Sequence, residues 1–209
     1  MEQTAVHILD YLKRTYDPEA ILVYGSFAQG RNGPHSDFDA CVLTKNAERT
    51  YDNSKIDGTV LDVFLYSPEA IEKTFQPEAF VQLSDAKIVL DRHGLAAKMQ
   101  RAVRTYIEQF PKKTPQELDH LLAWCDKMLD RARRGDAEGD YRWHWLLIDS
   151  LEIYFQLRGE FYFGPRKGLQ LLQEQDPAAF AVYVRALHTF QWDALAAWVQ
   201  LLHTRRQSA

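Results

Sequence analysis

The stretch Ile21–Thr44 constrains the fold of this chain more than any other, because two apolar runs bracket a turn-rich segment. The runs Ile21–Tyr24 and Phe38–Leu43 have the apolar, partly β-branched and aromatic composition of strands. Three glycines and a proline lie between them, and such residues punctuate secondary structure. The sequence therefore predicts a strand, a tight glycine turn, a short connection and a second strand.

The second run carries two carboxylates, Asp37 and Asp39, which are separated by one residue. Side chains at positions i and i+2 of a strand share a face, so the two acids are expected to point the same way. Like charges a few ångströms apart raise each other's proton affinity unless a cation lies between them. An all-oxygen site favours Mg²⁺ or Mn²⁺ over zinc. The alternative is that Asp37 caps a turn and Asp39 is a solvated strand residue.

A third acid, Asp62, is the only charged residue in the strand-like run Gly58–Tyr66. A lone carboxylate in such a run is either a misfit or a site residue, because burying an unpaired charge is costly. If this strand lies beside Phe38–Leu43, the three carboxylates converge.

Gly25 and Ser26 follow the first strand directly. A glycine lets backbone N–H groups approach an anion closely, and a helix that begins at Ser26 would add a favourable dipole. The turn and the acids together predict a site for a metal-bound polyphosphate.

These motifs, in this order and spacing, resemble the signature of the polymerase-β-type nucleotidyltransferase superfamily. The resemblance rests on Gly25-Ser26, Asp37-Phe38-Asp39-Ala40 and Asp62 between Leu61 and Val63, and it covers about residues 20–66. It implies that Asp37, Asp39 and Asp62 are catalytic metal ligands for Mg²⁺ or Mn²⁺, and that Gly25 and Ser26 hold the phosphates of a nucleoside triphosphate, with ATP as the default donor. The implied reaction transfers a nucleoside monophosphate to a hydroxyl and releases pyrophosphate.

Charge and hydropathy narrow the classes of partner. The chain of 209 residues has a formal net charge of −4 and no long run of one sign, which disfavours a nucleic-acid partner. The absence of a signal peptide and of a long apolar run predicts a cytoplasmic protein without a membrane span. A homodimer whose two subunits share one site is an alternative that the sequence leaves open.

Periodicity predicts an α+β chain in which a nucleotidyltransferase domain, residues 1–95, precedes a helical bundle, residues 96–209. In the first part we expect a mixed sheet with flanking helices, and a loop over the polar segment Lys45–Asp57. The expected strands are Ile21–Tyr24, Phe38–Leu43, Thr59–Tyr66 and Lys87–Leu90, after a first helix Thr4–Tyr16. The expected later helices are Ala96–Phe110, Pro115–Arg134, Asp140–Leu157, Asp176–Phe190 and Gln191–Arg205, with a further helix after Gly164.

Two features of the helical part invite a functional interpretation. Asp149 and Glu152 lie three residues apart among aromatic residues, and buried acids there would bind a cationic or hydroxylated acceptor or act as a general base. The alternative is that they pair with Arg142 or Arg158. Lys167 lies at a helix start, where a cation opposes the helix dipole, so a triphosphate contact is one reason for its place and a surface salt bridge is the other.

The layout of a catalytic domain followed by a bundle is similar to that of antibiotic nucleotidyltransferases, which modify aminoglycosides or lincosamides. This resemblance implies a small hydroxylated acceptor. The alternative is a regulatory or antitoxin-like protein that binds or nucleotidylates a partner protein.

Overall fold

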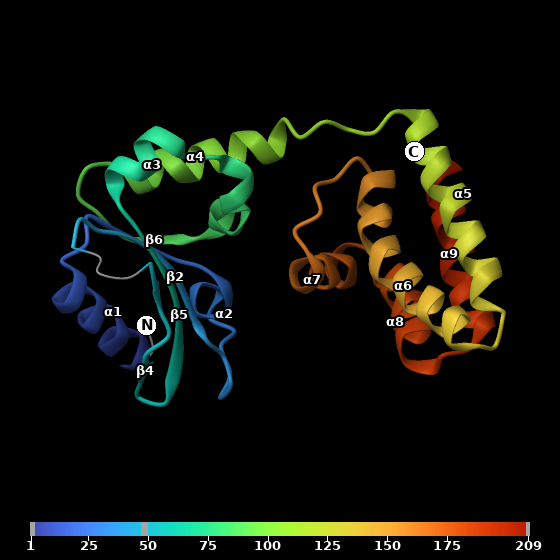
Figure 1. The fold of residues 1–209 in the computed structure, drawn as a ribbon, viewed down its shortest axis with the longest axis horizontal. Coiled ribbons are helices and arrows are strands. Elements are labelled where there is room, and N and C mark those ends of the chain that lie inside the picture. The colour runs from blue at the N-terminus through green and yellow to red at the C-terminus, as the bar shows by residue number, and fades with distance from the viewer. Residues whose placement is uncertain (1–2, 47–49, 208–209) are drawn as a thin grey trace. The chain divides into compact units, whose positions relative to one another are not determined.

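The computed structural model describes residues 3–46 and 50–207, and the chain divides into two compact units, Met1–Gln109 and Phe110–Ala209. Figure 1 shows the α+β first unit and the helical second unit, as expected from the sequence. The first unit contains helices α1 (Gln3–Tyr16), α2 (Gly25–Gln29), α3 (Pro68–Thr74) and α4 (Leu95–Glu108), and a 3₁₀ segment η1 (Pro77–Asp85). Its strands are β1 (Ala20–Val23), β2 (Phe38–Leu43), β3 (Tyr51–Asp52), β4 (Lys55–Ile56), β5 (Thr59–Tyr66) and β6 (Lys87–Asp91).

The strands form a mixed sheet in the order β3-β5-β2-β1-β6, with β4 paired to β5. Strands β2 and β5 are parallel, whereas β1 pairs antiparallel with β2 and with β6. The loop predicted over Lys45–Asp57 is wrong where the structure describes it, because β3 and β4 lie in this segment. Tyr51 of β3 packs against Phe64 of β5 with ring centroids 5.0 Å apart, a cross-strand aromatic contact that stabilises the pairing.

Each face of the sheet is covered by its own helices. Helices α1 and α2 pack on the face that presents Ile21, Phe38 and Val63, whereas α3, η1 and α4 pack on the face that presents Leu22 and Cys41. Figure 1 shows α1 and α4 on opposite sides of the sheet. Because side chains alternate along a strand, Asp39 of β2 lies on the same face as Cys41.

Helix α4 belongs to the first unit, which therefore extends to Gln109 rather than to the boundary expected at residue 95. Its apolar stripe of Ala96, Met99 and Val103 is buried against the sheet and η1. Gln100 of α4 donates from Nε2 to the carbonyl oxygens of Leu83, at 3.0 Å, and Ala86, at 2.8 Å. These contacts tie α4 to the end of η1.

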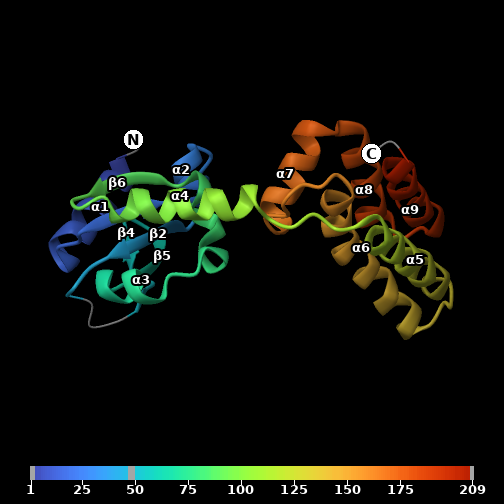
Figure 2. The same cartoon turned by 90° about the horizontal axis from the view of Figure 1, so that it is seen from above.

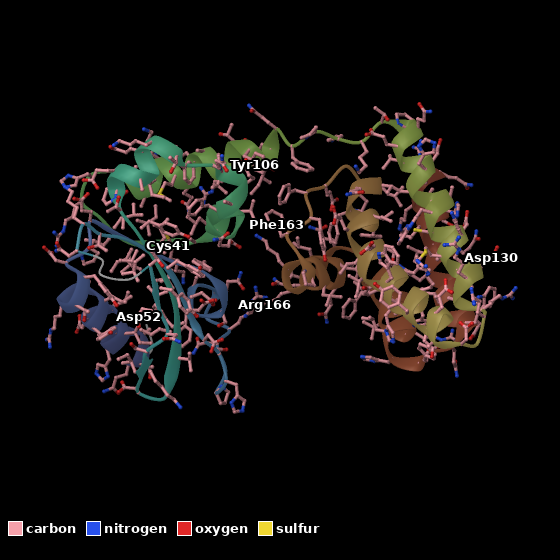
Figure 3. The ribbon with its side chains drawn as sticks, in the orientation of Figure 1. Cys41, Asp52, Tyr106, Asp130, Phe163 and Arg166 are labelled. Atoms are coloured by element: carbon pink, nitrogen blue, oxygen red, sulfur yellow. The ribbon has the colours of Figure 1, made fainter. Side chains whose placement is uncertain are left out.

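One carboxylate, Asp52 on β3, is completely buried in the first unit (Figure 3). Its Oδ2 accepts hydrogen bonds from the hydroxyls of Tyr16, at 2.6 Å, and Tyr11, at 3.1 Å, and its Oδ1 accepts one from the Ser54 amide at 2.9 Å. Burial alone would raise the pKa of Asp52, but the hydrogen bonds from Ser54, Tyr16 and Tyr11 outweigh it and lower the pKa. The ionised carboxylate therefore joins α1 to the β3 edge of the sheet.

We expect Asp52→Asn to lower the free energy of unfolding by about 1–3 kcal/mol near neutral pH, because charge-assisted hydrogen bonds are lost. A folded-state pKa below the unfolded value of about 4 stabilises the protein above that value, and this stabilisation is lost as the pH falls through the folded pKa. The difference between the natural protein and the variant should therefore shrink in acid. Urea unfolding across the acid range measures it, with the exposed Asp10→Asn as control. A difference that stays constant with pH would contradict the assignment.

The second unit is a bundle of five helices in the part of the chain that is described. They are α5 (Pro115–Ala132), α6 (Ala137–Leu157), α7 (Pro165–Gln175), α8 (Pro177–Thr189) and α9 (Trp192–Gln207). Figure 2 shows α5 beside α6 and α8 beside α9. The capping box predicted at Thr114 and Glu117 is present, with the Glu117 carboxylate accepting from the Thr114 amide at 2.7 Å. The core surrounds Trp198 of α9 and Tyr154 of α6. None of the helices in the described ranges is both long and apolar enough to cross a bilayer.

Candidate active site

Asp39 and Asp62 lie side by side on the neighbouring parallel strands β2 and β5. The strand register pairs the two residues directly, and both are half-buried. Adjacent strands are about 4.8 Å apart and paired residues share a face, so the two carboxylates stand next to each other. Asp37 lies one residue before β2 and is exposed. The structure thus brings together two of the three predicted acids, and the third, Asp37, directly precedes β2.

The glycine turn and the acid pair form one unit. Gly25 has φ +68°, and a Cβ atom at this position would lie 2.0 Å from Oδ2 of Asp39. Glycine is required there both by its backbone conformation and by the carboxylate above it. The Tyr24 amide also donates to the carbonyl oxygen of Asp39 at 3.1 Å. Ser26, the next residue after the glycine, is buried in α2.

Two tyrosines that the sequence analysis missed border these acids. Burial raises the pKa of Tyr24, and the negative charges of Asp62 and Asp39 raise it further. Loss of hydration also raises the pKa of Tyr51, with added contributions from the charge of Asp62 and from a hydrogen bond that the Tyr51 hydroxyl donates to it. Both phenols therefore stay protonated in a region of negative potential. Tyr24 could have been suspected from its place before Gly25, whereas Tyr51 lies in the segment predicted as a loop.

The donor set fits a hard divalent cation held together with a ligand's phosphates. Within residues 3–46 and 50–207, no group of three His, Cys, Asp or Glu side chains is close enough to hold a metal ion alone. Mg²⁺ is usually bound by one or two carboxylates, with phosphate oxygens and waters as further ligands. The Asp39–Asp62 pair supplies two such carboxylates, and the Asp39 carboxylate packs directly against the backbone of Gly25.

Lys167, the residue predicted to contact phosphate, lies near the start of α7 in the second unit. Its Nζ lies 3.9 Å from the ring centroid of Phe163. This cation–π contact gives a local reason for a lysine at a helix N-terminus, where the dipole disfavours positive charge. Arg166, the preceding residue, is exposed (Figure 3). The phosphate contact of Lys167 stays a prediction.

Asp149 and Glu152 are exposed on α6, so the expectation that they are buried among aromatic residues is wrong. Neither forms the arginine pair considered as the alternative. The Trp145 indole donates to Asp149 Oδ2 at 2.6 Å, and Gln156 Nε2 donates to Glu152 Oε1 at 2.7 Å. The cause is that apolar residues lie on all sides of α6, including its solvent face, so their pattern does not show which side is buried.

Both acids nevertheless line a groove of about 360 Å³ on the second unit. Its other lining residues are Lys113, Leu121, Trp124, Ile153 and Gln156. The lining combines an indole from α5 with two carboxylates from α6. Sites of this kind suit a small molecule that has both polar and apolar groups.

A solved structure and a family model are similar to this chain. A solved nucleotidyltransferase-like protein from Exiguobacterium sibiricum 255-15 is 15% identical, and the alignment covers 98% of this chain and 73% of that one with a TM-score of 0.41. No curated protein matches the chain. The family model described as "Polymerase beta, Nucleotidyltransferase" matches residues 7–98, the part that contains Gly25, Ser26 and the three acids. Most of the first unit thus matches the polymerase-β nucleotidyltransferase domain model, which supports a function in nucleotidyl transfer.

Proposed function

We propose that the protein is a metal-dependent nucleotidyltransferase that moves AMP from ATP to a hydroxyl of a small molecule and releases pyrophosphate. The observation that carries this proposal is the register of Asp39 with Asp62 beside Gly25, inside the part of the chain that matches the family model. Two adjacent carboxylates beside a glycine turn suit a cation and a phosphate chain better than either ligand alone.

In this proposal Mg²⁺ or Mn²⁺ would be held by Asp39 and Asp62 together with phosphate oxygens of the nucleotide, with Asp37, just before β2, as a further ligand. When bound, the ion neutralises phosphate charge and orients the α-phosphorus for in-line attack. The backbone at Gly25 and the Ser26 hydroxyl hold the β- and γ-phosphates. These groups position the triphosphate so that its α-phosphorus faces the acids.

Asp62 is the general base of the proposed reaction. It takes the proton of the acceptor hydroxyl while that oxygen forms a bond to the α-phosphorus and the bond between the α-phosphorus and the bridging oxygen breaks. Pyrophosphate leaves with the electrons of the broken bond. The Tyr51 phenol, on the adjacent strand β3, lies close enough to Asp62 for the charge of this carboxylate to raise the pKa of the phenol.

The acceptor in this proposal is an amine-bearing, hydroxylated small molecule that binds in the groove of the second unit. Asp149 and Glu152 provide negative charge, and Trp124 provides an aromatic wall. Gln156 Oε1 is buried and has no hydrogen-bond donor among the described residues, so it can accept from a ligand. The chemistry of aminoglycosides, which combine amines with hydroxyls, matches these groups.

The test is label transfer from α-labelled ATP with Mg²⁺ to a panel of aminoglycosides, lincosamides and candidate proteins. We expect a labelled small molecule and stoichiometric pyrophosphate. The double variant Asp149→Asn, Glu152→Gln should raise the KM for the acceptor by about tenfold or more and leave the KM for ATP unchanged, because two charged contacts are lost.

Two outcomes would redirect the proposal. Label on a protein alone would favour the regulatory or antitoxin-like alternative. The absence of ATP binding with either Mg²⁺ or Mn²⁺ in a calorimetric titration would refute nucleotidyl transfer altogether.

A further inference from the structure

A cavity of about 500 Å³ lies on the face of the sheet opposite to the acids. Residues of helices α1 and α2 and of strands β1, β2 and β6 line it. The lining residues are Ala5, Leu9, Val23, Phe27, Ala28, Gly30, Asn32, Phe38, Lys87 and Val89. Because Phe38 and Asp39 are consecutive on β2, their side chains lie on opposite faces, so this cavity is separate from the candidate active site.

An irregularity of the edge strand shapes one wall. The register between β1 and β6 shifts between Ile21 and Leu22, which pair with Leu90 and Ile88, so Val89 is an extra residue on β6. Both Val89 and Leu90 pack toward the core on the α1 side. A bulge of this kind bends an edge strand and redirects a side chain, and bulges are frequent beside binding sites.

Most side chains that line the cavity are apolar, and one amide, Asn32, and one cation lie among them. Leu9, Phe27, Phe38 and Val89 supply aliphatic and aromatic surface, whereas Lys87 contributes an ammonium group. Lys87 is exposed and forms no ion pair within residues 3–46 and 50–207. The volume lies within the range of about 300–1,000 Å³ that is typical of small-molecule pockets, which combine apolar walls with a few placed polar groups.

We propose that this cavity is a second ligand site, which binds a small amphipathic anion: an apolar chain or ring body with one carboxylate. The body fills the space between α1, α2 and the bulged strand, and the carboxylate pairs with the ammonium group of Lys87. This inference is independent of the proposed catalytic activity, since it uses none of the residues of the acid pair.

The test uses the full chain and decanoate as the probe, below the concentration at which it forms micelles, with 1-decanol as the uncharged counterpart. Isothermal titration should show one saturable decanoate site and weaker binding of 1-decanol. Lys87→Gln should weaken decanoate binding by about tenfold or more, the loss typical of one charge-assisted contact, and should leave 1-decanol binding unchanged. The matched control is Lys73→Gln, which removes an exposed lysine of α3 and should change neither.

A second variant and a direct map locate the site. Val89→Trp places a large side chain in the cavity and should abolish binding of both probes, with circular dichroism as the check on folding. Amide resonances of α1, α2 and β6 should shift on titration with decanoate. The proposal is overturned if no saturable binding occurs, if Lys87→Gln binds as tightly as the natural protein, or if the shifted resonances lie in the second unit.

Discussion

Gly25→Ala should reduce nucleotidyl transfer by about 100-fold or more, although it adds only one methyl group. The new Cβ would lie 2.0 Å from Oδ2 and 2.8 Å from Cγ of Asp39, so the carboxylate has to move away. A displacement of about 1 Å in a reacting group costs about 100-fold in rate. Steady-state kinetics with α-labelled ATP measure the loss, and a titration with Mg²⁺ and a non-hydrolysable ATP analogue should show weaker binding.

Gly30→Ala is the matched control for this variant. Gly30 has the same φ of +68°, but a Cβ there would meet nothing within 4 Å. Both variants place an alanine in a left-handed backbone conformation, which lowers the free energy of unfolding by about 1–2 kcal/mol. Only Gly25→Ala also displaces the carboxylate. Equal activity losses in the two variants would mean that backbone strain, rather than the contact with Asp39, accounts for the effect.

Asp39→Asn and Asp62→Asn should each lower the rate of transfer by about 1,000-fold. Without metal, each should raise the stability of the protein. Two carboxylates in register repel each other, so removing one charge should raise the free energy of unfolding by about 1 kcal/mol in the presence of a chelator. In the natural protein, Mg²⁺ with ATP should raise the melting temperature, because a ligand stabilises the state that binds it. The variants should lose most of this shift.

Thermal unfolding with EDTA and with Mg²⁺ plus ATP measures both effects in one experiment. Glu78→Gln is the control, since it removes an exposed carboxylate from η1 in the same unit. A variant at Asp39 or Asp62 that keeps the full Mg²⁺-dependent shift would show that the acid pair is not the metal site.

Much of the first unit can be predicted from the sequence, because its central strands are local features. Strands β2 and β5 begin and end where their apolar runs do, and a single charged residue in such a run marks a candidate site. That β2 and β5 are parallel neighbours depends on contacts between distant segments, which no local pattern contains. The sequence therefore predicts which acids matter, but it does not establish that Asp39 and Asp62 are the pair in register.

The elements that were missed have a common physical cause. Strand β3 has only two residues and a polar neighbourhood, so its pairing depends on Tyr51 and the buried Asp52 rather than on an apolar run. Tyr51 could not be assigned to the site without that strand. On α6, Tyr141 and Ile148 are 63% and 68% exposed, which explains why aromatic neighbours were a poor guide to the burial of Asp149.

The order of strands in the sheet has a consequence for the way the chain folds. Strand β1 pairs with β6, and Ala20 lies opposite Asp91 in this pairing. The sheet is therefore complete only when the long segment between these two residues has been closed into a loop. In the second unit, α5 packs on α6, and α8 packs on α9. The two helices of each pair follow one another along the chain. Folding rates fall as contacts become more distant in sequence. The first unit, which is synthesised first, should therefore fold more slowly than the second unit. Until β6 is added, β1 presents an open edge, and this interval is when the protein is most exposed to aggregation.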